Sequence, residues 1–548
     1  MNTNTIGCIT AKKMCLTILS TMSKIIGLSS TVHDAGCALI IDGEVVFAME
    51  EEKLTGIKAL YRQSLFPTLT LNLIKQKFNV DLHTCDHIAQ ARLYDVELLP
   101  KEYNTNLIKN KIQSFSHHQC HAIGAYFTSG MEGKVISLSH DGAGARSRGK
   151  IYLCEDGETN LIHSQWIPTT SSLAGLWGLA TKNLGWAQLK DEGKVVGLAA
   201  HGKTNDLIYH YLSQCIYYDN MNFKDGGWSA KFEYICNKLR KDKWFTEEKK
   251  RADFSATLQK FVEDNMAKLL LQLHQQHPDY QKLSLSGGLF ANVKLNQFIN
   301  NLDYFDEIYI HQAMGDSGLA LGGAICKAVE LEEIKRPLKV DHVYWGQNFT
   351  KEDWAQEIEK HQSITSENFD VKRAASLINL GHIIGLFVGQ TEYGPRALGN
   401  RSILVRPTDA ETHQKLNERL DRTETMPFAP SVLSEYADEI FKCQKSKYAA
   451  EFMTICYDTR DEWIDRIPAV VHRIDKTSRP HIVKKDANPL YYNIIDEYRK
   501  ISGFPIVLNT SLNAHGDPIN NYPYQAIQLL LDGCLDYLVT ETSIYSKK

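Results

Sequence analysis

Two segments of the 548-residue chain repeat one local plan: an apolar strand, a His-Asp turn rich in small residues, and a β-hairpin. The first copy comprises a predicted strand at 24–29, the turn at 33–36, and hairpin strands at 37–41 and 44–48. The second comprises a predicted strand at 135–139, the turn at 140–144, a strand at 150–154 and another strand after 157. An Asp-Gly pair lies at each hairpin, where it is a strong turn signal. The repeat predicts two duplicated half-domains that face a shared cleft.

A pair of histidines is the clearest sign of a metal site. His117 and His121 stand four residues apart, at the start of a predicted helix that continues through 122–127. Residues four apart share one helical face, so the two imidazoles converge as in half of a metal site. Asp141, at the end of a strand, and Asp316, in a glycine turn, are candidates for the other ligands. The spacing also arises by chance, with a ring that caps or packs, so it leaves both interpretations open.

Glycines after the predicted strands are candidates for binding a nucleotide or phosphate. A residue without a side chain lets phosphate oxygens reach backbone N–H groups at a helix N-terminus. The candidates are Gly142, Gly144, Gly287, Gly288, Gly315 and, just after the paired glycines, Asn292. A tight strand-to-helix turn explains the paired glycines equally well.

Composition narrows the class of protein. The chain is too long for one compact core, so two domains are expected. A formal net charge of −4 disfavours a nucleic-acid-binding role. The 12 cysteines form no Cys-x-x-Cys pair, which indicates neither a thiolate zinc site nor a regular disulfide framework and favours a reducing cytoplasm. The apolar run at 14–22 is too short for a membrane span, so we expect a loose tail or an alternative start at 1–21 and no membrane partner.

Several motifs together resemble those of a known enzyme family. They are His33-Asp34, Glu50-Glu51-Glu52-Lys53, His117 to His121, Asp191-Glu192-Gly193-Lys194, Ser286-Gly287-Gly288, Gly315-Asp316-Ser317-Gly318 and Tyr393-Gly394-Pro395-Arg396 continuing to Ser402. Their order is similar to that of the O-carbamoyltransferases, which include the nodulation (NodU), cephamycin, novobiocin and tobramycin enzymes. The resemblance implies an α/β chain with an actin-like duplicated N-terminal domain and a C-terminal α+β domain like threonylcarbamoyl-adenylate synthase (YrdC-like).

The resemblance also implies a two-stage reaction. Carbamoyl phosphate and ATP, the latter with Mg²⁺, form a carbamoyl adenylate, and the carbamoyl group then passes to a hydroxyl of a small molecule. His117, His121, Asp141 and Asp316 are the implied metal ligands, with iron the usual ion, although these ligand types also suit manganese or zinc. His33 is the implied base for the acceptor, and Asp34 and Lys58 are further catalytic candidates.

Arginines and amides of the second domain are candidates for binding carbamoyl phosphate. A guanidinium offers a planar fork that matches two phosphate oxygens. The candidates are Arg396, Arg401, Arg422, Arg479, Asn509 and Ser511. Taken singly, each arginine is equally well explained as a solvated surface charge.

The chain departs from the family pattern at two positions where many members carry cations. Leu420 and Met426 occupy them here. Lys415 and Arg419, from the preceding predicted helix, are candidates to compensate for the missing charges. The way this chain binds phosphate is therefore not transferable from the family.

We expect a tail at 1–21, an actin-like domain at 22–340, a linker at 341–369 and a YrdC-like domain at 370–548. An actin-like small-molecule kinase and a metal-dependent hydrolase are alternative functions, and a nucleotide-binding regulator is a third. Neither a kinase nor a hydrolase explains the motifs after 390. The sequence does not identify the acceptor, and a homodimer is possible.

Overall fold

The computed structural model describes residues 22–30, 33–58, 66–92, 100, 103, 105–144, 146–167, 171–225, 228–421 and 428–548. The predicted tail and two positions discussed above, Arg422 and Met426, lie outside these residues. Among the helices of the described part, none combines the length and the apolar character that a membrane span requires.

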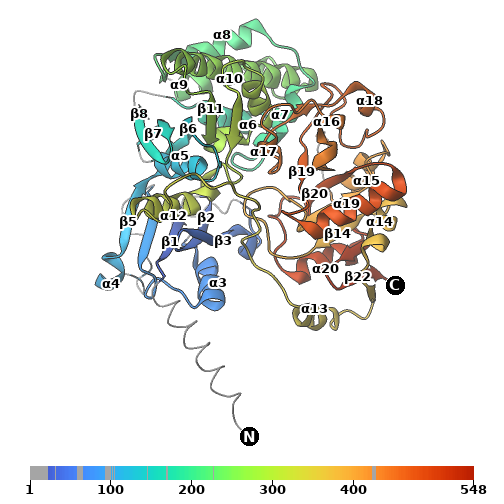
Figure 1. Ribbon diagram of the computed structural model, residues 1–548. Coiled ribbons are helices and arrows are strands. Elements are labelled where there is room, and N and C mark those ends of the chain that lie inside the picture. Colours follow the sequence, from blue (N-terminus) through green and yellow to red (C-terminus); the bar gives the residue numbers. More distant parts are fainter. Residues whose placement is uncertain are drawn as a thin grey trace.

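The N-terminal domain contains two five-stranded sheets with one topology (Figure 1). The first has the order β3-β2-β1-β4-β5 and is built from β1 (Lys24–Ser30), β2 (Ala35–Ile41), β3 (Glu44–Glu50), β4 (His87–Arg92) and β5 (Ile112–Ser116). The second has the order β8-β7-β6-β11-β12 and is built from β6 (Lys134–Gly144), β7 (Ser147–Glu155), β8 (Glu158–Trp166), β11 (Lys282–Ser286) and β12 (Glu307–Ile310). In both sheets the first three strands form an antiparallel meander and the other two add in parallel. The predicted duplication is confirmed.

Two helices, α5 (His117–Phe127) and α12 (Leu319–Glu330), pack on each other and on the sheets (Figure 1). Their crossing is close because small residues lie there: a Cβ on Gly124 would stand 2.9 Å from the Cα of Gly322. Both helices therefore pack at the centre of the duplicated domain, and each carries or adjoins a candidate metal ligand.

The remaining elements of this domain flank the two sheets. Near the first sheet are α2 (Glu52–Thr55), α3 (Thr68–Phe78) and α4 (Asn106–Lys109). Between β8 and β11 the chain forms α6 (Leu173–Asn183), α7 (Glu192–Ala199), α8 (Asp206–Cys215), β9 (Ile216–Asp219), β10 (Asn222–Asp225), α9 (Trp228–Lys241) and α10 (Glu248–Gln276). Around the candidate ligand loops lie η2 (Gly288–Ala291), α11 (Val293–Asn300) and η3 (Asp316–Gly318). The long helix α10 packs against α7, α8 and α11 and so supports the elements next to the site.

The C-terminal domain is built on an eight-stranded mixed sheet of order β13-β22-β21-β14-β15-β20-β16-β19. Its strands are β13 (Ile364–Asn368), β14 (Ile384–Phe387), β15 (Arg401–Val405), β16 (Ala429–Leu433), β19 (His481–Val483), β20 (Ile506–Ser511), β21 (Tyr537–Val539) and β22 (Ser543–Lys547). A separate pair joins β17 (Tyr457–Asp458) to β18 (Thr477–Ser478). The segment predicted as a linker at 341–369 contributes β13, which pairs with β22.

Helices cover this sheet, and α14 packs on α19. The helices are α13 (Lys351–Ile358), α14 (Val371–Asn379), α15 (Thr412–Arg419), η4 (Ser434–Tyr436), α16 (Ala437–Ile440), α17 (Lys447–Ala450), α18 (Asp461–Ile464), α19 (Pro489–Ser502) and α20 (Pro523–Leu531). The structure is thus a mixed α/β chain in which each half carries its own sheet system.

A buried ion pair of the N-terminal domain is hydrogen-bonded to the backbone of the C-terminal domain. Lys53 and Glu50 lie 2.8 Å apart with side chains that are 2% and 5% exposed. Lys53 also donates to the carbonyl oxygens of Glu392 and Gly394, at 2.6 and 2.9 Å, and Glu50 accepts the Gly394 N–H at 2.6 Å. Every charge at this junction therefore has partners from the opposite domain.

Loss of one partner of this pair should be costly. In Lys53→Met the carboxylate of Glu50 stays buried without its counter-charge, so we expect the free energy of unfolding in urea to fall by about 3–5 kcal/mol. Lys75→Met is the control, because the exposed Lys75–Asp81 pair is worth less than about 1 kcal/mol. The double variant Glu50→Leu/Lys53→Met should recover part of the loss. Equal, small effects for Lys53→Met and Lys75→Met would contradict this account.

Candidate metal centre and adjoining cavity

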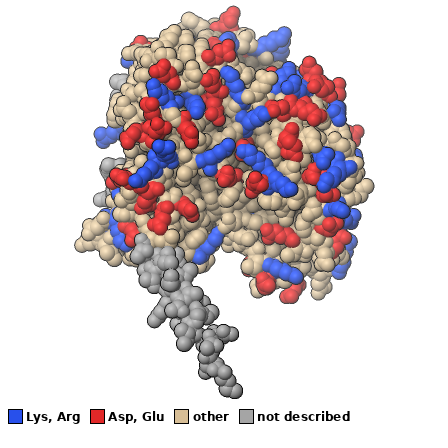
Figure 2. Space-filling view, viewed as in Figure 1, with Lys and Arg blue, Asp and Glu red and all other residues tan. Residues whose placement is uncertain are grey.

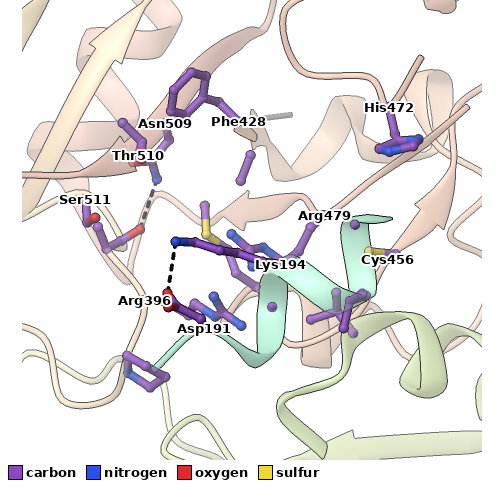
Figure 3. Close-up of a pocket in the computed structure, with 18 of the residues that line it drawn as sticks. Asp191, Lys194, Arg396, Phe428, Cys456, His472, Arg479, Asn509, Thr510 and Ser511 are labelled. Atoms are coloured by element: carbon purple, nitrogen blue, oxygen red, sulfur yellow. Dashed lines mark hydrogen bonds and ion pairs between the residues drawn. The ribbon is translucent and has the colours of Figure 1, made fainter. Parts of the chain in front are cut away.

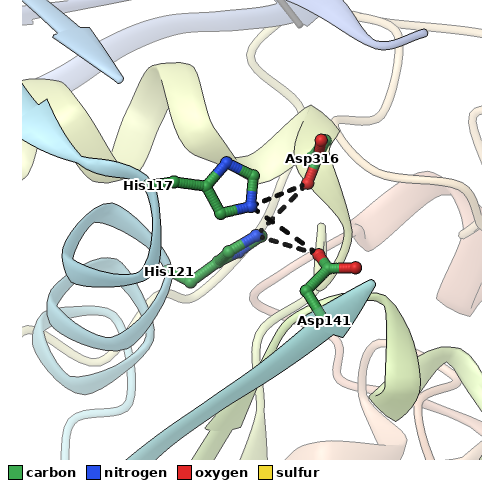
Figure 4. A group of neighbouring side chains, drawn as sticks. All are labelled: His117, His121, Asp141 and Asp316. Atoms are coloured by element: carbon green, nitrogen blue, oxygen red, sulfur yellow. Dashed lines mark hydrogen bonds and ion pairs between the residues drawn. The ribbon is translucent and has the colours of Figure 1, made fainter. Parts of the chain in front are cut away.

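Four buried or half-buried side chains converge at the centre of the N-terminal domain (Figure 4). His117 and His121 come from the first two turns of α5, Asp141 from the end part of β6, and Asp316 from η3 just before α12. One ligand atom from each lies within 4.8 Å of the others. The two imidazoles stand on one helical face because their spacing of four residues nearly matches a helical turn. The structure therefore brings together all four residues that the sequence analysis grouped as metal ligands.

The distances within this cluster are those of groups facing a common point. Nε2 of His117 and of His121 lie 3.3 and 3.4 Å from Oδ1 of Asp316, and Nε2 of His121 lies 3.3 Å from Oδ2 of Asp141. Both ring nitrogens of His117 are buried, and neither has hydrogen-bond geometry to a described residue: Nε2 has only its ion-pair contacts with Asp316 and Asp141. Buried polar atoms are normally satisfied, so this ring fits the role of a metal ligand.

The cluster also favours a cation electrostatically. Burial lowers the pKa of His117, but the charges of Asp316 and Asp141 outweigh it and raise the pKa to about 10. Burial raises the pKa of Asp141 and Asp316, yet the neighbouring histidines hold both well below the usual range. Two ionised carboxylates enclosed in this way need compensating positive charge. Two nitrogens with two oxygens suit iron, manganese or zinc.

Some of the glycines predicted to bind a nucleotide or phosphate shape this cluster, and others do not. The Gly288 N–H donates to Oδ2 of Asp141 at 3.1 Å and so orients that carboxylate. A Cβ on Gly144 would lie 2.3 Å from the His117 ring, so the absence of a side chain at Gly144 makes room for the His117 imidazole. The positions of Gly142 and Gly315, by contrast, face open space. Gly287 has a φ of 98° and packs against the backbone of His140, where a side chain would clash.

Removing a ligand should remove the metal. We expect His117→Ala and Asp316→Ala to weaken binding of Fe²⁺, Mn²⁺ or Zn²⁺ by more than the 10–100-fold typical for loss of a residue that only supports a ligand. The measurement is metal content after loading and desalting. The control is His163→Ala. His163 lies on β8, and its ring contacts Asn222 of β10. Unchanged content in both ligand variants would refute the site.

A single methyl group should test the role of Gly144. In Gly144→Ala the new Cβ overlaps the His117 ring, so the imidazole must leave its position and metal content should fall although all four ligands remain. Gly142→Ala adds the same group two residues earlier, where nothing lies within 4 Å, and should retain the metal. Equal metal content in the two variants would show that His117 adjusts without cost.

His33 and Asp34 lie beside the cluster. Nδ1 of His33 is 2.9 Å from Oδ2 of Asp34, and Nε2 is 3.7 Å from Oδ2 of Asp316. Burial lowers the pKa of His33, but the hydrogen bond to Asp34 and the charges of Asp316, Asp34 and Asp141 raise it to about 9. Lys58, the third catalytic candidate, is not in this group and instead lines a neighbouring cavity.

That cavity has a volume of about 470 Å³ and lies between the two domains (Figure 3). Of the predicted carbamoyl phosphate residues, Arg396, Arg479, Asn509 and Ser511 line it. The N-terminal domain supplies the opposite wall, where Lys194 extends from α7 into the cavity and pairs with Asp191 at 3.0 Å. Burial lowers the pKa of Arg396, and the nearby positive charge of Arg479 lowers it further. Two guanidinium groups held so close favour an anionic ligand.

Arg401 and Asn292 do not line the cavity. The Arg401 side chain is fully buried, donates to the carbonyl oxygens of Val388 and Asn400 at 2.7 and 2.9 Å, and stacks on Phe387. The Asn292 side chain caps α11 and donates to Gln259 at 2.9 Å. Both side chains therefore hold local structure. Asn509, although on the wall, also donates to the Ala397 carbonyl and the Ser431 hydroxyl.

The two residues considered as substitutes for the missing family cations point elsewhere. Lys415 pairs with Glu411 at 3.3 Å, and Arg419 pairs with Asp536 at 2.7 Å. Neither lines the cavity, and Leu420 is buried in the core. Cations from the N-terminal domain that the site prediction omitted lie on the wall instead, namely Lys190, Lys194 and Lys294. Lys194 belongs to the Asp191-Glu192-Gly193-Lys194 motif, which does not by itself show that the side chain faces this cavity. No local pattern marks Lys190 or Lys294, because their place on the wall depends on how the domains pack.

Comparisons with known proteins place the chain in one family. Models of the carbamoyltransferase N-terminus and C-terminus match residues 59–325 and 375–547. Nodulation protein NolNO of Sinorhizobium fredii is 31% identical over 98% of this chain and 83% of its own length. Nodulation protein NolO of Bradyrhizobium diazoefficiens is 31% identical over 79% of each chain. The chain belongs to the carbamoyltransferase family.

Among solved structures, component A of the (R)-2-hydroxyglutaryl-CoA dehydratase of Acidaminococcus fermentans is similar to part of this chain. It is 16% identical, with a TM-score of 0.36 over 56% of this chain and 99% of that chain.

Proposed function

We propose that this protein is an O-carbamoyltransferase that uses carbamoyl phosphate and ATP to carbamoylate a hydroxyl of a small molecule. The observation that carries the proposal is the cavity between the domains, which presents Arg396 and Arg479 together. Guanidinium groups bind phosphate oxygens in pairs, and both co-substrates carry phosphates. The C-terminal domain is assigned a YrdC-like role, the activation of the carbamoyl group.

The charge of the cavity wall supports anionic co-substrates. Six cationic side chains line it: Lys58, Lys190, Lys194, Lys294, Arg396 and Arg479. Three acidic ones do so: Asp191, Asp475 and Asp517. Two of these acids are ion-paired with wall lysines, Asp191 with Lys194 and Asp475 with Lys294. The balance is positive, as a site for carbamoyl phosphate and nucleotide requires.

The proposed reaction has three chemical steps. Carbamoyl phosphate and water give phosphate and carbamate. A carbamate oxygen displaces pyrophosphate from the α-phosphorus of ATP, which leaves carbamoyl adenylate. The acceptor hydroxyl then attacks the carbamoyl carbon and AMP departs. The products are phosphate, pyrophosphate, AMP and the carbamate ester.

The second stage is assigned to the His-Asp cluster. His117, His121, Asp141 and Asp316 would hold a divalent metal, iron in the first instance, which when bound supplies a Lewis acid for the carbamoyl or phosphate oxygens. His33 lies beside the cluster and is oriented by Asp34 at 2.9 Å. A cation bound at the cluster would offset the charges of Asp316 and Asp141, which raise the pKa of His33, and the neutral imidazole would then suit removal of the proton from the acceptor hydroxyl.

A small acceptor fits the surface better than nucleic acid does. Lys and Arg are interleaved with Asp and Glu on the face seen in Figure 2, without a broad area of one sign. Nucleic-acid binding relies on a concentrated basic surface. The alternative functions, a small-molecule kinase and a metal-dependent hydrolase, do not explain why Arg396 and Arg479 of the C-terminal domain line the cavity together.

The two stages should fail separately in two variants. Arg396→Ala removes a charge-assisted contact worth about 1.5–3 kcal/mol, so adenylate formation should fall at least about tenfold. His33→Ala should leave adenylate formation intact and abolish transfer. The measurements are pyrophosphate release without acceptor and carbamoylated product with acceptor. Equal loss of pyrophosphate release in both variants would contradict the assignment of His33 to transfer alone.

A further inference from the structure

A histidine and an aspartate of the C-terminal domain form a pair on the cavity wall that the scheme above does not use. Nδ1 of His472 lies 3.1 Å from Oδ1 of Asp475, and both residues line the cavity. The backbone N–H of Asp475 can also donate to Nδ1, at the longer distance of 3.4 Å, in the tautomer that has no proton on that nitrogen. The shorter contact with a carboxylate favours a proton on Nδ1, which leaves Nε2 as the basic nitrogen of the ring.

The carboxylate of Asp475 is itself held firmly. It accepts hydrogen bonds from the hydroxyl and N–H of Thr477 at 2.9 and 3.2 Å, and Lys294 lies 3.1 Å away. Burial raises the pKa of Asp475, but His472 and Lys294 lower it well below the usual range, so the group is ionised. A base whose second nitrogen is oriented by a fixed carboxylate is the arrangement that activates nucleophiles in many enzymes.

Lys294 gives this pair a link to the other domain. It belongs to α11, on the N-terminal side of the cavity, and also donates to Gln297 at 2.6 Å. Gln297 in turn donates to Asp458 at 2.8 Å, so two neighbouring side chains of α11 contact the C-terminal domain. The orientation of His472 therefore depends on contacts from both domains.

We infer that His472, oriented by Asp475, is the general base that activates water for the cleavage of carbamoyl phosphate. The inference rests on the proposed function. The water oxygen bonds to phosphorus, the bond from phosphorus to the carbamoyl oxygen breaks, and the water proton passes to Nε2. Carbamate leaves with that oxygen, and Asp475 stabilises the imidazolium. Arg396 and Arg479 lie on the same wall, where they suit the phosphate group.

A bypass of the cleavage step tests this role. General-base catalysis contributes about 10²–10⁴-fold, so His472→Ala should lose at least about 100-fold in kcat for phosphate release from carbamoyl phosphate. The KM for carbamoyl phosphate should stay within about threefold. When ammonium carbamate replaces carbamoyl phosphate, pyrophosphate release from ATP should return to the wild-type level, which also shows that the variant is folded. Asp475→Asn should show a smaller loss in kcat with the same rescue.

His201→Ala is the matched control, because its ring contacts that of His472, with centroids 5.4 Å apart, but is not part of the cavity wall. It should behave as wild type with both substrates. Equal loss of pyrophosphate release from carbamoyl phosphate and from carbamate in His472→Ala would overturn the inference, as would a raised KM with unchanged kcat. Wild-type protein that releases no phosphate and pyrophosphate from carbamoyl phosphate and ATP would instead overturn the proposed function itself.

Discussion

The ion pair of Glu50 and Lys53 fixes the relation between the two candidate sites. Taking both charges out of water is costly, and the cost is offset only because Gly394 and Glu392 supply hydrogen bonds from the other domain. Glu50 ends β3 and pairs with Gly36 in β2, three residues after His33. Gly394 stands two residues before Arg396. The junction therefore sets the position of Arg396, on the cavity wall, relative to His33, which lies beside the candidate metal cluster.

A second contact strengthens the same relation. The hydroxyl of Tyr393 donates to the carbonyl of Ser317 at 2.7 Å, next to the candidate ligand Asp316. The loop that carries Arg396 thus packs directly on the loop that carries the candidate metal ligand Asp316. In the proposed reaction a carbamoyl group activated at one site would have to reach the other, and a fixed distance between the two loops would serve that requirement.

The sequence predicted the parts of this arrangement that depend on local pattern. The repeat of strand, His-Asp turn and hairpin is a periodic signal, so the two sheets were predictable, and the four-residue spacing placed His117 and His121 on one face of α5. The role of Arg401 was not predictable in this way. Its residue type suits phosphate binding, but in the structure the side chain is buried and donates to the carbonyl oxygens of Val388 and Asn400. Whether an arginine faces a ligand or supports a loop depends on packing, which the linear pattern does not contain.

The cavity also shows why the two family models do not correspond to two independent units. The models divide the chain between residues 325 and 375, yet the wall combines Lys194 and Lys294 from one side with Arg396 and Arg479 from the other. Lys294 orients the carboxylate that in turn holds His472. The C-terminal domain by itself would lack these cations and the support for Asp475. Cations from both sides of the domain boundary line this cavity, so the packing of the domains, and not either domain alone, defines the charge of its wall.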